Sequence, residues 1–85
     1  MTVTEAELHE RILQEKRLVA LEVQTEAWAD GISEGVDPEI MAMAGMETIL
    51  AHLVRECGAE SARSLLAMMQ QQLESGMFRS QEWLN

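Results

Sequence analysis

The 85-residue sequence predicts an all-α fold of three helices, and three local signals carry that prediction. Thr4 with Glu7, and Asp37 with Pro38, are typical helix starts, and Gly58 follows a periodic apolar run where a helix should end. Apolar residues recur every three or four positions, and no stretch alternates as a strand would. We therefore expect a single domain over residues 1–85, with helices at residues 4–29, 38–57 and 60–75 and an aromatic tail at residues 77–85.

The first predicted helix is the longest. Thr4 and Glu7 form a capping box, in which a hydroxyl and a carboxylate each satisfy a backbone donor of the first turn. No Gly or Pro interrupts the chain until the stop signal Asp30-Gly31, so this helix should have about 25 residues and a length near 38 Å. Its main apolar stripe, which should cover the two later helices, consists of Leu8, Ile12, Val19 and Val23.

Three further apolar residues, Leu18, Leu21 and Trp28, project from another side of the first helix. The middle of the helix is therefore apolar nearly all round, which is not expected of a helix exposed on one side. This surplus apolar surface predicts that two copies of the chain pair through the first helix as a homodimer. The alternative is that the C-terminal tail covers these residues.

The second and third helices each carry one apolar stripe. At about 100° per residue, one face of the second helix holds Ala42, Met43, Met46, Ile49, Leu50, Leu53, Val54 and Cys57. The stripe of the third helix holds Ala62, Leu65, Leu66, Met69 and Leu73. Gly58 suits the left-handed residue that would close the second helix. We expect these helices to form an antiparallel hairpin that the first helix covers, as in other small bundles.

The tail after Gly76 carries Phe78, Trp83 and Leu84 among polar residues, so we expect it to dock as an arm or a short helix on its own subunit or on its mate. The candidates for an interface are the surplus apolar residues of the first helix, two methionines of the second helix and a tryptophan of the tail. These candidate interface residues are Leu18, Leu21, Trp28, Met43, Met46 and Trp83.

The composition excludes several classes of partner. Fifteen acidic residues against six basic ones give a formal net charge of −9, which opposes binding to nucleic acid or anionic lipid. The longest nearly apolar run, residues 40–46, is too short to cross a bilayer, and the acidic N-terminus does not resemble a secretory signal. The single cysteine, Cys57, cannot form an internal disulfide and suits a reduced thiol packed as a small hydrophobe. These features indicate a cytoplasmic protein.

No motif indicates catalysis, a cofactor or a metal. His9 and His52 are not preceded by glutamate at the Glu-x-x-His spacing of bundle metal sites. Met41 and Met43 lie about 200° apart on a helix and cannot grip one soft ion together. The glycines match no phosphate-binding or dinucleotide-binding fingerprint. We therefore expect no enzymatic activity, no cofactor and no metal.

The sequence thus favours a non-enzymatic module for protein–protein interaction, a small adaptor or regulator that acts as a homodimer. Its expected partners are a second copy of itself and another protein, with no nucleic acid and no membrane. Two alternatives remain open at this point. One is an acidic modulator of transcription that binds a DNA-binding protein, and the other is a helical bundle that binds a small molecule or a metal.

Overall fold

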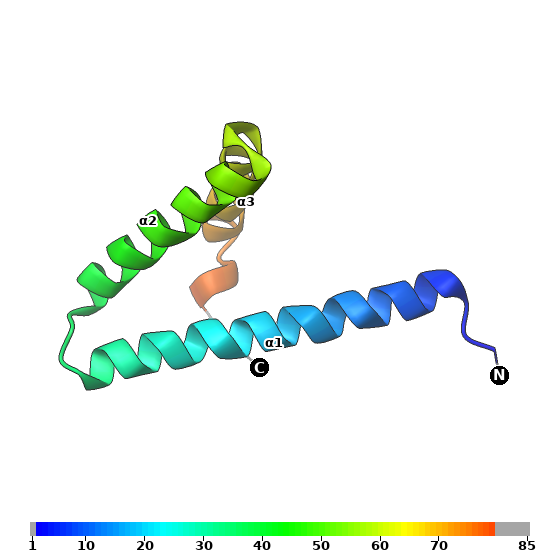
Figure 1. Ribbon diagram of the computed structural model, residues 1–85, viewed down its shortest axis with the longest axis horizontal. Coiled ribbons are helices and arrows are strands. Elements are labelled where there is room, and N and C mark those ends of the chain that lie inside the picture. Colours follow the sequence, from blue (N-terminus) through cyan, green and yellow to red (C-terminus); the bar gives the residue numbers. More distant parts are fainter. Residues whose placement is uncertain (1, 80–85) are drawn as a thin grey trace. The chain divides into compact units, whose positions relative to one another are not determined.

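The computed structural model describes residues 2–79, and these form three α-helices with a short 3₁₀ turn and no strand. The helices are α1 (Glu5–Ser33), α2 (Pro38–Cys57) and α3 (Ala59–Glu74), and the 3₁₀ turn η1 spans Met77–Arg79 (Figure 1). The prediction of an all-α fold with three helices is confirmed for this part of the chain.

The chain divides into two compact units, Met1–Asp37 and Pro38–Asn85. The first unit holds α1 alone, and the second holds α2, α3 and η1. An isolated helix has no neighbouring element within its unit against which to bury side chains, so the apolar stripes of α1 remain accessible there. Among the described residues, no helix is long and apolar enough to cross a membrane.

The start of α1 carries half of the predicted capping box. Thr4 adopts an extended backbone, and its hydroxyl accepts a hydrogen bond from the Glu7 N–H at 3.1 Å. The reciprocal bond, in which the Thr4 N–H would donate to the Glu7 carboxylate, is not formed in the described structure. Thr4 therefore satisfies one of the free N–H groups of the first turn, and that turn carries Glu5 and Glu7 near the positive end of the helix dipole.

The end of α1 differs from the prediction, because the helix continues through Gly31 to Ser33 instead of stopping at residue 29. Gly35, with φ at 92°, is the left-handed residue that ends the helix. The Gly35 N–H donates to the Ile32 carbonyl and the Val36 N–H donates to the Gly31 carbonyl, both at 3.0 Å. These two bonds form a Schellman motif, which satisfies carbonyls that a stop at Gly31 would leave open. The four added residues place Ile32 on the helix.

The second unit begins and turns where the sequence predicts. α2 starts at Pro38 and ends at Cys57, and Gly58 has φ at 91°. The Gly58 N–H closes α2 by donating to the Val54 carbonyl at 2.9 Å. The Asp37 carboxylate makes no capping hydrogen bond in the described structure, so the start of α2 relies on the fixed φ of Pro38.

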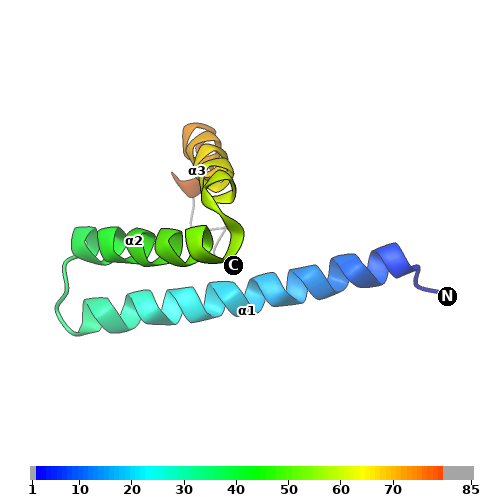
Figure 2. The ribbon, with the colours of Figure 1, turned by 45° about the horizontal axis from the view of Figure 1, so that its top comes forward.

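α2 and α3 contact each other, chiefly near the turn at Gly58, because most contacts between them join residues fewer than 12 positions apart. Figure 2 shows α3 leaving the C-terminal end of α2 at this turn. Ala62, in the second turn of α3, is 6% exposed and is the only buried side chain among residues 2–79. The unit is therefore held together at one end of its two helices, and most of both apolar stripes stays accessible.

Candidate interaction surfaces

An apolar groove of about 600 Å³ lies within the second unit, where α2, α3 and η1 meet. We call it the α2–α3 groove. Its lining residues are Met46, Ile49 and Leu50 from α2, Leu65, Leu66, Met69, Gln70 and Leu73 from α3, and Phe78 from η1. All but Gln70 are apolar, so the groove offers contact area to apolar side chains and almost no directional hydrogen bonding.

The predicted stripes of α2 and α3 both open into this groove, which explains why it is apolar. Met46, a predicted interface residue, lines it and is 54% exposed. Two lining residues lie outside the predicted stripes. Gln70 stands at a polar position, where its amide donates to the Glu74 carboxylate at 3.3 Å. Phe78, half-buried, comes from the tail, and its aromatic side chain among polar neighbours is the feature of the sequence that predicted docking there.

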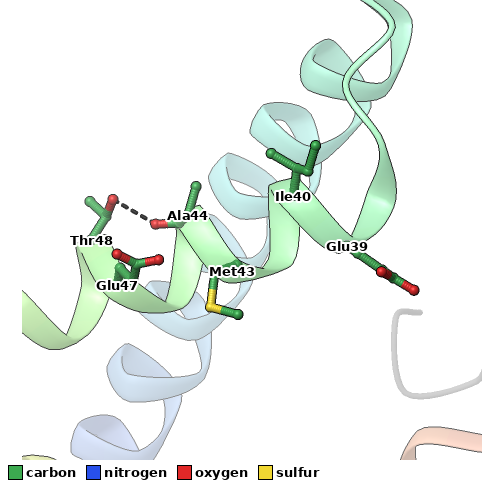
Figure 3. A pocket seen from close by; sticks show the side chains of 6 residues that line it. All are labelled: Glu39, Ile40, Met43, Ala44, Glu47 and Thr48. Atoms are coloured by element: carbon green, nitrogen blue, oxygen red, sulfur yellow. Dashed lines mark hydrogen bonds between the residues drawn. The ribbon is translucent and has the colours of Figure 1, made fainter.

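Met43, the other predicted interface residue of α2, does not line the α2–α3 groove. It is 64% exposed and belongs to a shallower hollow formed by residues of α2 alone, between Glu39 and Thr48 (Figure 3). The Thr48 hydroxyl in this hollow donates to the Ala44 carbonyl at 2.7 Å, so its proton is already engaged within α2. Met43 is thus an accessible apolar side chain on one helix face.

The three predicted interface residues of α1 fall on one side of the helix. Leu18 is 57% exposed and Trp28 is 43% exposed, while Leu21 is half-buried. Ile32 joins the same side because α1 runs to Ser33, and sequence reasoning missed it by ending the helix too early. The sixth predicted interface residue, Trp83, lies outside the described residues.

Charged side chains do not converge in the described part of the chain. Among the described residues one ion pair forms, Arg63 with Glu60 at 3.3 Å, and it joins two exposed side chains on α3. Residues 2–79 contain no group of three His, Cys, Asp or Glu side chains arranged to hold a metal ion. Cys57 is a free, exposed thiol, whereas the sequence suggested a packed one. The side chain that is buried where α2 and α3 meet near the turn is Ala62 instead.

No protein-family model, curated protein or solved structure matches the sequence. The described residues expose apolar faces on all three helices, and their polar groups are dispersed.

Proposed function

We propose that this protein is a non-enzymatic module for protein–protein interaction, a small cytoplasmic adaptor or regulator that works as a homodimer. One observation carries the proposal: Ala62 is the only buried side chain of residues 2–79, while large apolar residues of all three helices are more than a third exposed. Apolar side chains gain about 1.5–3 kcal/mol each when fully removed from water. Because so many apolar side chains of this chain are accessible, another polypeptide that covers them would stabilise it.

Each of the two units carries an accessible apolar surface. The stripe of α1 that holds Leu8, Ile12, Val19 and Val23 is exposed on a helix without partners in its own unit. The α2–α3 groove is an apolar surface of the kind that accepts the apolar face of a helix. We propose that this stripe covers the groove, with α2 and α3 as an antiparallel hairpin. The side of α1 that holds Leu18, Leu21 and Trp28 then remains for a second copy.

The assembly is tested by light scattering coupled to size exclusion, over a range of about 1 µM to 500 µM, since the populations of a reversible dimer depend on concentration. We expect a mass approaching twice the 9.5 kDa of one chain as concentration rises. The thermal midpoint should rise in parallel, because only the folded chain pairs. A mass of one chain throughout the range would contradict the homodimer.

The adaptor role is tested by using the purified chain as bait with two glutamate variants on α2. Met43→Glu places a charge on the exposed apolar side chain of α2 that lies outside the α2–α3 groove, and His52→Glu places the same charge on the opposite, polar face of α2. We expect a protein partner that the wild type and His52→Glu retain and that Met43→Glu loses, because a buried unpaired carboxylate opposes apolar docking. Equal retention by both variants would contradict docking at Met43.

A further inference from the structure

α1 carries a line of residues spaced three and four positions apart, which only the full length of the helix makes visible. Leu18, Leu21, Thr25, Trp28 and Ile32 follow one another at spacings of 3, 4, 3 and 4, and we call this line the α1 seam. Such spacing repeats every seven residues and keeps one side of a helix facing a partner helix along its length. The end of α1 at Ser33, not at residue 29, brings Ile32 into the seam.

Thr25 is the polar member of the α1 seam, and its hydroxyl is already satisfied. It donates to the Leu21 carbonyl of the same helix at 2.7 Å. Burying an unpaired hydroxyl would oppose association, but a hydroxyl bonded within its own helix does not leave an unsatisfied donor. The Thr25 methyl group can therefore face a partner among Leu21 and Trp28.

From this geometry we infer that the α1 seam pairs, in parallel and in register, with the α1 seam of a second copy of this chain. The inference rests on the proposed homodimer and specifies its contact. In heptad terms Leu18, Thr25 and Ile32 occupy a positions, and Leu21 and Trp28 occupy d positions. Ile32 at a and Leu21 at d follow the pattern of β-branched a and leucine d residues that favours two parallel strands over higher assemblies.

Charges beside the α1 seam select the parallel direction. Arg17 occupies a g position and Glu22, five residues later, an e position, which are the positions that meet across a parallel pair. Two symmetric pairs of opposite charge would form. In an antiparallel pair e faces e and g faces g, so Glu22 would meet Glu15, Glu22 or Ala29 of the second copy. None of these offers a positive charge.

Arg17 and Glu22 also lack partners on their own helix. The positions three and four residues away from Arg17 hold Gln14, Leu13, Ala20 and Leu21, and those around Glu22 hold Val19, Leu18, Thr25 and Glu26. Neither residue forms an ion pair in the described structure. Both charges are therefore available to a second chain.

The α1 seam is short, which limits the affinity. Toward the N-terminus its heptad positions become Gln14, Arg11 and Glu7, so apolar pairing begins at Leu18 and ends near Ile32, over about 22 Å. Stable coiled coils usually sustain the pattern for three or four heptads. We therefore expect a dissociation constant of micromolar order or weaker, on the order of a transient interface.

Charge reversal measured by sedimentation equilibrium tests the pairing. Arg17→Glu should weaken dimerisation about tenfold, because two attractive contacts become repulsive, and Arg17→Glu with Glu22→Arg should restore it. Lys16→Glu is the matched control, since it changes the net charge equally at an f position, which points away from the α1 seam. Equal weakening by Arg17→Glu and Lys16→Glu, or no recovery in the double variant, would overturn the inference.

Disulfide trapping tests the direction independently. In a Cys57→Ser background, Gln14→Cys puts a thiol at the d position next to the α1 seam, and Lys16→Cys puts one at f. We expect air oxidation to cross-link Gln14→Cys at least tenfold faster than Lys16→Cys, because paired d positions meet across a parallel seam while f positions point away from it. A dimer that Gln14→Cys fails to cross-link would refute the parallel seam but leave the proposed function standing. A monomer at every concentration would refute both.

Discussion

Gly58 should be the position where adding a single methyl group most damages the second unit. Its φ of 91° and ψ of 163° lie in a region that is essentially restricted to glycine. An added Cβ would meet no described atom within 4 Å, so the cost of Gly58→Ala comes from the backbone and not from a clash. We expect a loss of about 1–3 kcal/mol in the free energy of unfolding. In a domain of this size that is a fall in thermal midpoint of about 4–8 °C per kcal/mol.

Gly45→Ala is the matched control for this experiment. Gly45 lies within α2 with helical backbone angles, and an added Cβ there also meets no described atom within 4 Å. Alanine should raise the stability by about 0.5–1 kcal/mol, because glycine is a poor helix residue. Urea unfolding of both variants at one protein concentration measures the difference. If Gly58→Ala were as stable as Gly45→Ala, the reasoning from the Gly58 backbone would be refuted, and a loss at Gly45 would show that another backbone packs there.

Three smaller effects follow from the described contacts. Thr4→Ala should lower the helicity of α1 and cost about 1 kcal/mol by removing its cap, while Thr2→Ala should change neither, and equal circular dichroism for both would contradict the cap. Ala62→Gln should lower the free energy of urea unfolding by about 1–3 kcal/mol, because it overfills the contact near the turn. Ala67→Gln, on the exposed side of α3, should change it by no more than about 0.5 kcal/mol, and similar values for the two variants would mean that Ala62 is not packed. Arg63→Ala should cost less than about 0.5 kcal/mol at low salt, since its ion pair is solvated, and a larger loss would reveal a contact beyond that pair.

Local signals in the sequence predicted the helices well because each signal acts within a few residues. Pro38 at the start of α2 and Gly58 after its end are confirmed, and both depend on φ preferences of single residues. The predicted end of α1 was wrong because Gly31 and Gly35 both carry the glycine signal of a helix end. Which glycine ends the helix depends on hydrogen bonds to the Ile32 and Gly31 carbonyls. These bonds satisfy the carbonyls of the last turn only when the helix stops at Ser33.

The candidate surfaces were predicted in part. The apolar periodicity of α2 and α3 placed Ile49, Leu50 and Leu66 on the faces that the structure brings into one groove. The contribution of Phe78 depends on where the chain turns after Gly76, and periodicity carries no information about that turn. The position of Met43 outside the groove follows because α2 and α3 contact each other chiefly near Gly58, which a stripe on one helix does not reveal.

The central claim is that α1 keeps one apolar side for a second copy of the chain, and the accessibility of Trp28 tests it most directly. In a Trp83→Phe variant, Trp28 is the only tryptophan, and acrylamide quenching reports its exposure. We expect quenching to fall severalfold between about 1 µM and 500 µM, as the 43% exposed ring of the single chain becomes covered. Quenching that stays unchanged over this range, with a mass of one chain, would contradict the claim.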